Sequence, residues 1–247
     1  MTRQRPEIVF FDLGDTLVRA EPSWAAVYVS ALSQHGIDID EAALAAAMAA
    51  TPWAVDGPFE TTEEASYARL RALDEAILAR LGHSGLPDAV FRTLDDLFQR
   101  PSAWRVFPDV VPGLRGLRAA GIRTGLISNW GWTAPVLLRA LGLADLLEVV
   151  VVSARAGWHK PDPGIFRRGL EEAGVTADRA VHVGDSFTND VVGARGAGLR
   201  PVLIDRALLD PARAPQRVPR GDPVPVVSDL VDLLDLLGAL RATPAPA

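Results

Sequence analysis

Short apolar runs that end in polar or turn-forming residues recur along the chain. The first run, Ile8 to Phe11, lies between Pro6 and the turn-forming sequence Asp12-Leu-Gly-Asp15. Runs of this length that are rich in β-branched residues and bounded by Gly, Pro, Asp or Ser are typical of buried strands. The same pattern predicts further strands at residues 122–128, 149–152, 180–183, 201–204 and, more weakly, 224–227.

Apolar residues at helical spacing fill the segments between these strands. Leu114 and Leu117 precede Ala119-Ala-Gly121, and a glycine in this position commonly ends a helix. The 3.6-residue spacing also predicts helices over residues 136–141, 165–173, 189–197 and 230–237. This alternation predicts an α/β fold with a doubly wound, Rossmann-like core, in which helices cover both faces of a mostly parallel sheet.

One long interval breaks the alternation of strands and helices. From about Arg19 to Trp104 we expect no strand, and the pattern predicts helices over residues 24–32, 41–50, 63–81 and 88–98. About 85 residues are far too many for one connection within a compact α/β unit, so we predict an inserted helical domain. The predicted division gives an α/β core domain at 1–18 and 105–241, the helical insert at 19–104 and a disordered tail at 242–247.

Composition narrows the class of protein. Of 247 residues, 49% are hydrophobic and 23% charged, so the chain can bury a sizeable core and is not disordered. A net charge of −6 argues against nucleic acid or an anionic membrane as a partner. No apolar run is long enough to predict a transmembrane helix. The absence of cysteine excludes disulfides and thiolate metal sites, and it fits a reducing cytoplasm. We expect a monomer or a homodimer.

Polar side chains follow four of the predicted strands. The first strand is followed by residues 12–16, the second by Ser128 and Asn129, the third by Lys160, and the fourth by residues 185–190. Parallel sheets bind ligands at the carboxyl ends of their strands. We therefore expect these side chains to meet at one edge of the sheet.

Three of these side chains are carboxylates that would repel one another. Asp12, Asp185 and Asp190 can share one site if a cation lies between them, and a hard divalent ion with oxygen ligands, most simply Mg²⁺, meets this need. Lys160 can keep a carboxylate nucleophile ionised, and Ser128 can donate to phosphoryl oxygens. Together these groups predict phosphoryl transfer through an aspartyl-phosphate intermediate.

The order of the motifs resembles that of the haloacid dehalogenase-like (HAD) hydrolase superfamily. The motifs are Asp12-x-x-x-Thr16, Ser128-Asn129, Lys160-Pro-Asp-Pro163 and Gly184-Asp-Ser-x-x-Asn-Asp190. The likeness spans residues 8 to about 204, and the helical insert resembles the C1-type cap of that family. The resemblance implies a Mg²⁺-dependent hydrolase, in particular a phosphatase that acts on a small phosphorylated metabolite.

The resemblance also implies a role for each motif residue. The catalytic residues would be Asp12, Lys160 and Ser128. The phosphate-binding residues would be Ser128, Asn129, Lys160 and Thr16. The metal ligands would be Asp12, Asp185, Asp190 and the backbone carbonyl of Gly14.

One position departs from the family pattern. Family phosphatases carry a second aspartate, the general acid and base, two residues after the nucleophile, and here that residue is Gly14. The nearest acid is Asp15, and neighbouring loop residues need not point the same way. General acid–base catalysis contributes about 10²–10⁴-fold. We therefore expect poor turnover of alkyl phosphates and better turnover of phosphates whose leaving group needs no proton.

Two other functions stay open at this point. A 2-haloacid dehalogenase releases a halide that needs no proton, so Gly14 would not hinder it, although dehalogenases of the family need no metal and lack an acid at the position of Asp185. A catalytically degraded domain would instead bind a phosphorylated ligand or a protein partner. Trp130 beside the second motif either lines a substrate pocket or simply packs, and we expect Trp24 to belong to the core of the insert.

Overall fold

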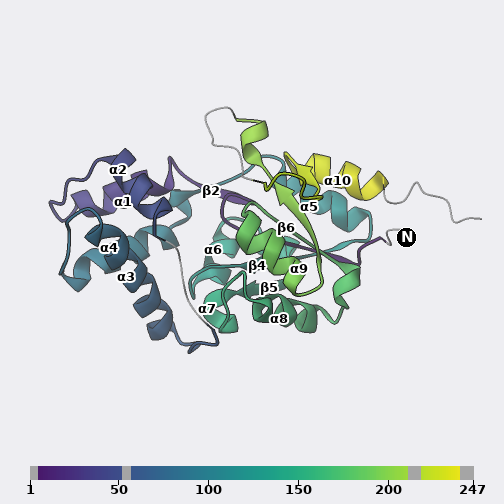
Figure 1. Ribbon diagram of the computed structural model, residues 1–247, viewed down its shortest axis with the longest axis horizontal. Coiled ribbons are helices and arrows are strands. Elements are labelled where there is room, and N and C mark those ends of the chain that lie inside the picture. The colour runs from purple at the N-terminus through teal and green to yellow at the C-terminus, as the bar shows by residue number, and fades with distance from the viewer. Residues whose placement is uncertain (1–4, 52–56, 211–217, 240–247) are drawn as a thin grey trace, which may run out of the picture.

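A six-stranded parallel sheet forms the centre of the molecule. The computed structural model describes residues 5–51, 57–210 and 218–239, so the predicted tail at 242–247 lies outside the described residues. The sheet has the order β5-β4-β1-β6-β7-β8, and every neighbouring pair is parallel. Figure 1 shows helices around this sheet and helices α1 to α4 to one side of it. The prediction of an α/β, Rossmann-like fold is confirmed. The strands are β1 (Ile8–Phe11), β4 (Arg123–Ser128), β5 (Val149–Val152), β6 (Ala180–Gly184), β7 (Arg200–Ile204) and β8 (Val226–Val227).

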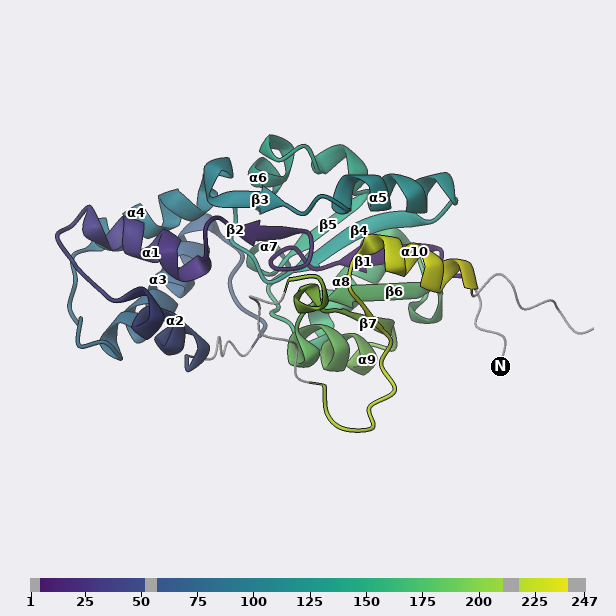
Figure 2. The same cartoon turned by 90° about the horizontal axis from the view of Figure 1, so that it is seen from above.

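Helices cover both faces of this sheet because its central strand is apolar on both sides. In β1, Val9 and Phe11 face one hydrophobic cluster, and Ile8 and Phe10 face another. The first cluster is covered by α5 (Val110–Ala119), α6 (Ala134–Ala140) and α10 (Leu230–Ala239). The second is covered by α8 (Pro163–Ala173) and α9 (Gly193–Gly196), as Figure 2 shows from above.

Four helices form a second body beside the sheet, here called the cap. Their buried faces share a separate hydrophobic cluster that includes Leu32, Leu44, Leu78 and Phe91. Ser23, Asp40 and Thr62 each cap a helix by accepting a hydrogen bond from a backbone amide of the first turn. The cap helices are α1 (Trp24–Ser33), α2 (Glu41–Ala49), α3 (Glu63–Ala79) and α4 (Asp88–Gln99).

A two-stranded antiparallel sheet joins the cap to the core. It consists of β2 (Val18–Ala20) and β3 (Trp104–Val106). The expectation that no strand lies between Arg19 and Trp104 is therefore wrong at both ends of that interval. Strands of three residues are too short to show an alternating pattern. The division of the chain into domains at residues 18 and 105 stays a prediction.

The remaining helices are short. The helix predicted over 189–197 is a π-helical segment, Phe187–Val192, followed by α9. One turn of helix, α7 (Ser153–Ala156), follows β5. Among the described residues, no helix has the length and apolar character needed to cross a membrane. The 3₁₀ helices are Pro101–Ala103, Ala144–Leu146, Ala177–Arg179 and Arg206–Leu208.

Candidate active site

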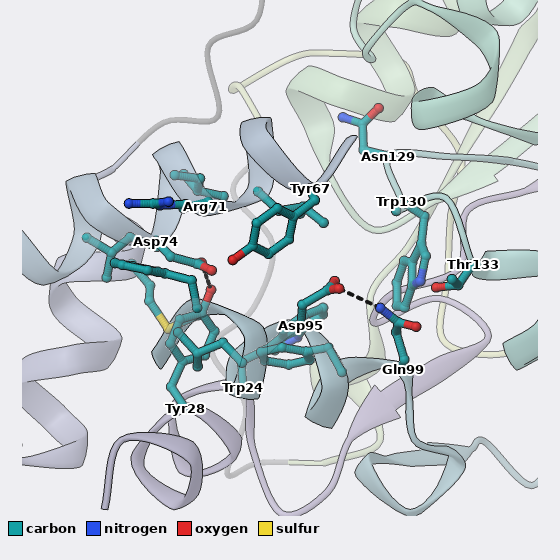
Figure 3. A pocket seen from close by; sticks show the side chains of 18 of the residues that line it. Trp24, Tyr28, Tyr67, Arg71, Asp74, Asp95, Gln99, Asn129, Trp130 and Thr133 are labelled. Carbon is teal, nitrogen blue, oxygen red and sulfur yellow. Dashed lines mark hydrogen bonds between the residues drawn. The ribbon is translucent and has the colours of Figure 1, made fainter. Parts of the chain in front are cut away.

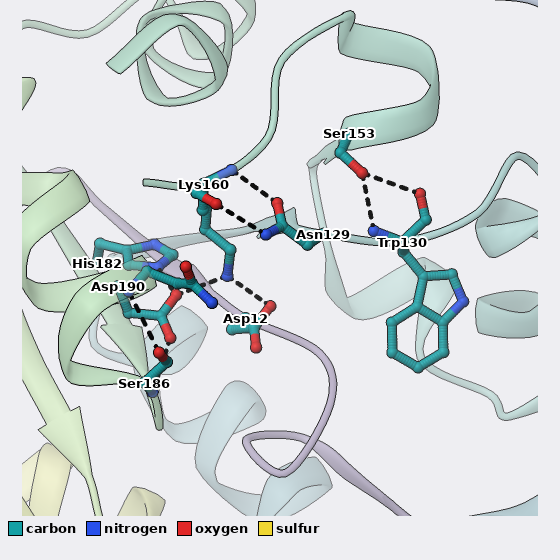
Figure 4. A network of polar contacts seen from close by, with 9 residues as sticks. Asp12, Asn129, Trp130, Ser153, Lys160, His182, Ser186 and Asp190 are labelled. Carbon is teal, nitrogen blue, oxygen red and sulfur yellow. Dashed lines mark hydrogen bonds and ion pairs between the residues drawn. The ribbon is translucent and has the colours of Figure 1, made fainter. Parts of the chain in front are cut away.

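The predicted site residues lie at the carboxyl ends of β1, β4 and β6 and in the loop before α8. All of them except Thr16 line one pocket of about 210 Å³. The polar contacts that organise this pocket are shown in Figure 4. The topology thus brings together side chains from four separate parts of the sequence. The predicted residues among those that line the pocket are Asp12, Gly14, Ser128, Asn129, Lys160, Asp185 and Asp190.

Lys160 is buried at the centre of this network. Its Nζ lies 2.7 Å from Oδ1 of Asp12 and 2.6 Å from Oδ1 of Asp190, and Lys160 is only 3% exposed (Figure 4). Burial by itself would lower the pKa of Lys160, but the charges of Asp12 and Asp190 raise it above its usual value. Lys160 is therefore a fixed cation between two carboxylates.

Asp190 is held by three hydrogen-bond donors. Its Oδ1 accepts from Lys160 and from Nε2 of His182 at 2.8 Å, and its Oδ2 accepts from the backbone N–H of Ser186 at 2.9 Å. Burial would raise the pKa of Asp190, but Lys160 and His182 lower it below the usual range. A Cβ at Gly184 would lie 2.1 Å from Cγ of Asp190, so only glycine allows this approach.

The pKa values of Asp12 and Asp185 are raised in this arrangement. Burial raises the pKa of Asp12 despite the nearby charge of Lys160. Burial, and then repulsion by Asp12 and Asp190, raise the pKa of Asp185 well above its usual value. Carboxylate oxygens of all three aspartates lie within 4.8 Å of one another. This oxygen-rich set has the chemistry to hold a hard divalent cation, which would relieve the repulsion.

Ser128 and Asn129 connect the end of β4 to the other motifs. The hydroxyl of Ser128 hydrogen-bonds Asp12. Oδ1 of Asn129 accepts from the backbone N–H of Lys160 at 2.7 Å, and its Nδ2 donates to the carbonyl of Lys160 at 3.0 Å. Both ends of the Asn129 side chain thus hold the main chain of Lys160 in place. Phosphate binding by Asn129 stays a prediction.

Thr16 lies beneath the pocket rather than on its wall. It is fully buried, and its carbonyl accepts a hydrogen bond from Nη2 of Arg206 at 2.6 Å. Arg206 also donates to Asp109 at 2.8 Å, so its guanidinium links the Thr16 carbonyl to the start of α5. Phosphate binding by Thr16 stays a prediction. Arg206 was not predicted as a site residue, although its place just after β7, at the same edge of the sheet, could have indicated it.

Two indoles occupy the space in front of Gly14. A Cβ at this position would lie 3.3 Å from Trp24 and 3.4 Å from Trp130. Asp15 has a left-handed backbone, with φ of 52°, and its Oδ2 accepts a hydrogen bond from Nε1 of Trp24 at 2.9 Å. The nearest acid is therefore tied to an indole. Trp24 packs beside Trp104 against a hydrophobic core cluster, as expected of a core residue, and it also lines the pocket.

Sequence comparisons agree with this geometry. A family model described as haloacid dehalogenase-like hydrolase matches residues 6–198. "Haloacid dehalogenase-like hydrolase domain-containing protein 3" of Bos taurus is 29% identical over 247 residues, which cover 95% of this chain and 96% of that protein. A phosphoglycolate phosphatase of Rhodospirillum rubrum is 33% identical over 207 residues, which cover 81% of this chain and 79% of that protein.

Solved structures share the fold. The putative HAD-hydrolase YfnB from Bacillus subtilis, solved bound to magnesium, superposes with a TM-score of 0.74 at 17% identity and covers 95% of this chain and 100% of its own. A HAD phosphatase from Thermococcus onnurineus gives a TM-score of 0.64 at 24% identity and covers 94% of this chain and 98% of its own. Because both identities are below 25%, these structures show only that the fold is shared.

Proposed function

Because this chain belongs to the haloacid dehalogenase-like hydrolase family, we propose that it is a Mg²⁺-dependent phosphatase of a small phosphorylated metabolite. The observation that carries the proposal is the position of Lys160, buried between Asp12 and Asp190 and beside Asp185. A carboxylate nucleophile, a fixed cation and a set of metal-binding oxygens are the groups that phosphoryl transfer needs. The similarity to a phosphoglycolate phosphatase supports the same chemistry.

Asp12 is the proposed nucleophile. Lys160 contacts one oxygen of its carboxylate and leaves the other to attack phosphorus. A bond forms between Asp12 and phosphorus while the bond to the leaving oxygen breaks, and water then cleaves the aspartyl phosphate to release inorganic phosphate. Ser128 and Lys160 stabilise the negative charge of the phosphoryl oxygens.

The proposed metal ligands are Asp12, Asp185 and the carbonyl of Gly14. Mg²⁺, when bound, neutralises the charge shared by the carboxylates and the phosphoryl group. Asp190 already accepts three hydrogen bonds, and a carboxylate has about four acceptor positions. We therefore assign Asp190 first to holding Lys160 and only second to supporting the metal.

The proposed enzyme has weak acid–base catalysis. Gly14 supplies no side chain, and the carboxylate of Asp15 is bound to Trp24. A leaving group that must be protonated, such as an alkoxide, therefore departs slowly, whereas a phenolate or an acyl anion departs without help. Esters of acidic alcohols and acyl phosphates are the expected substrates.

Hydrolysis of p-nitrophenyl phosphate tests the proposal. We expect activity that requires Mg²⁺, is abolished by EDTA, and falls by at least about 10³-fold in Asp12→Asn. Asp178→Asn, which changes an acid in the Ala177–Arg179 segment away from the pocket, is the matched control and keeps full activity. Activity that persists in EDTA and in Asp12→Asn would exclude this mechanism.

Dehalogenation is the second candidate, and the missing acid at Gly14 favours it. A halide leaves without a proton, but Asp185 would then have no task. Release of chloride from 2-chloropropionate in EDTA would reverse the ranking. Tight binding of phosphorylated ligands with no turnover of either substrate would instead indicate a degraded enzyme that only binds.

A further inference from the structure

A second cavity lies between the cap helices and the loop that follows β4. Its volume is about 340 Å³, which is within the usual range of small-molecule sites. Trp24, Asn129 and Trp130 line both this cavity and the catalytic pocket, so the two spaces adjoin. A molecule that places its phosphoryl group at Asp12 can extend its other end into this cavity, which is shown in Figure 3.

Several aromatic rings contribute to the cavity wall. The ring centroids of Trp104 and Trp130 lie 4.8 Å apart, and Trp24 contacts Trp104 with its ring nearly perpendicular. Aromatic faces carry partial negative charge and attract organic cations. The rings that contribute to the wall include Tyr28, Tyr67, Phe91, Phe98, Trp104 and Trp130.

Two carboxylates interrupt this aromatic wall. Asp74 of α3 is 7% exposed and accepts a hydrogen bond from the hydroxyl of Tyr28 at 2.5 Å. Asp95 of α4 is partly buried and accepts from Nε2 of Gln99 at 2.6 Å (Figure 3). Among the residues that the structure describes, neither acid has a cationic partner within 4 Å. The donors to the two carboxylates are a neutral hydroxyl and a neutral amide.

Among the described residues, Arg71 is the one cation that lines the cavity, and it forms ion pairs with other acids. Its guanidinium lies 3.0 Å from Glu75 and 2.9 Å from Asp88. Burial, followed by the neighbouring acids Asp95 and Glu75, raises the pKa of Asp74 to about 7. Among the described residues that line the cavity, no cation pairs with Asp74 or Asp95.

We propose that this cavity binds the leaving group of the substrate, and that this group is an aromatic or apolar body bearing a positively charged amine. The inference rests on the proposed function for the position of the phosphoryl group and adds the chemical class of the remainder. An ammonium placed between Asp74 and Asp95 is attracted to both carboxylates and contacts ring faces. A neutral group leaves the two acids without a cationic partner, and an anionic group is repelled.

Three aryl phosphates that differ only in charge test the proposal. The phosphate ester of tyramine carries an ammonium, that of 4-propylphenol has a methyl group in the same place, and that of 3-(4-hydroxyphenyl)propanoic acid carries a carboxylate. All three release a phenolate, so Gly14 affects them alike. We expect kcat/KM for the tyramine ester to exceed that of the propyl ester by about 10-fold or more, with the carboxylate ester slowest. Equal kcat/KM values for the first two would overturn the proposal.

Variants of Asp74 and Asp95 test whether these carboxylates cause the preference for the ammonium ester. In the double variant Asp74→Asn, Asp95→Asn, the ratio of kcat/KM between the ammonium and propyl esters falls to about 1. Asp96→Asn is the matched control, because Asp96 is an exposed neighbour of Asp95 on the same helix and does not line the cavity. It keeps the full ratio. A ratio that survives in the double variant would show that other residues create it, and would overturn the assignment.

Binding measurements test this inference independently of the proposed phosphatase activity. Dissociation constants of the three esters for Asp12→Asn, measured by quenching of tryptophan fluorescence, need no turnover. If the wild-type protein hydrolyses none of the esters, the proposed function fails, and the binding constants still decide the inference. About 10-fold tighter binding of the ammonium ester supports the cavity assignment, whereas equal binding of the ammonium and propyl esters overturns it.

Discussion

Two buried groups of carboxylates differ in how their charge is balanced. In the catalytic pocket, the cation of Lys160 lies between Asp12 and Asp190, and His182 donates to the same carboxylate. In the cap cavity, Asp74 and Asp95 accept hydrogen bonds from the neutral donors Tyr28 and Gln99, and no described cation lies within 4 Å of either. The first group is organised by the protein itself before any ligand arrives. The second group is balanced only when a ligand brings the positive charge.

Removal of Lys160 is expected to have the largest effect, because it breaks the balance of the first group. In Lys160→Met, Asp12 and Asp190 become buried anions without a cation, which costs about 3–5 kcal/mol of the free energy of unfolding. Urea denaturation without Mg²⁺ measures this loss. Arg168→Met, which breaks an exposed pair with Glu172, is the control and costs no more than about 0.5 kcal/mol. Equal losses of unfolding free energy in the two variants would show that Lys160 does not balance the charge of Asp12 and Asp190.

Gly14 lies in the catalytic pocket against Trp24 and Trp130, which also line the cap cavity, and an acid can be added at this position. Gly14→Asp restores a carboxyl beside the leaving group, but its Cβ needs Trp24 and Trp130 to move by a few tenths of an ångström. We expect hydrolysis of an alkyl phosphate to rise by up to about 10²-fold, with little change for p-nitrophenyl phosphate.

Gly14→Asn is the control for this gain, because it has the same size and cannot transfer a proton. A gain shared by Gly14→Asn would mean that the indoles had moved and that proton transfer was not the limitation. If neither variant hydrolyses alkyl phosphates faster, Gly14 does not limit the reaction.

The two groups also differ in how far the sequence predicted them. Asp12, Ser128, Lys160 and Asp185 follow buried strands, and parallel topology gathers strand ends at one edge. No comparable rule predicts that Asp74 and Asp95 line the cap cavity. Both come from the interior of helices, where an acid usually faces solvent.

The parts of the fold that were missed have a similar cause. The strands β2 and β3 have three residues each, which is too short for a readable alternation. The contact between Asp15 and Trp24 depends on the left-handed backbone of Asp15, which no pattern of apolar residues reports. Periodicity therefore predicts the layers of the fold, but not which side chains meet where the cap lies against the core.

The raised pKa of Asp74 predicts how the stability of the protein changes with pH. Its pKa is about 7 in the folded protein and 3.8 in an unperturbed carboxyl, so between these values the folded state binds more protons. Stability therefore falls as pH rises through this window. Asp74→Asn lacks this penalty and is expected to be more stable than the wild type by about 1–3 kcal/mol near pH 8, with the difference vanishing near pH 4.

Urea denaturation across this pH range measures the effect. Asp88→Asn is the control of opposite sign, because the hydroxyl of Tyr67 and the guanidinium of Arg92 lower the pKa of Asp88. That variant is not expected to be stabilised near pH 8. If Asp74→Asn is no more stable than the wild type there, the carboxylate is already neutralised within the folded chain, and the contrast between the two groups fails.

The smallest expected effect concerns Asp15, which lies in the catalytic pocket but binds an indole of the cavity wall. Asn tolerates the left-handed backbone at this position and can still accept the hydrogen bond of Trp24, so Asp15→Asn should alter stability by less than about 0.5 kcal/mol. Because the acid serves this contact and not proton transfer, kcat should change by less than about 3-fold for aryl and alkyl phosphates alike. A fall of about 10²-fold confined to alkyl phosphates would instead identify Asp15 as the general acid.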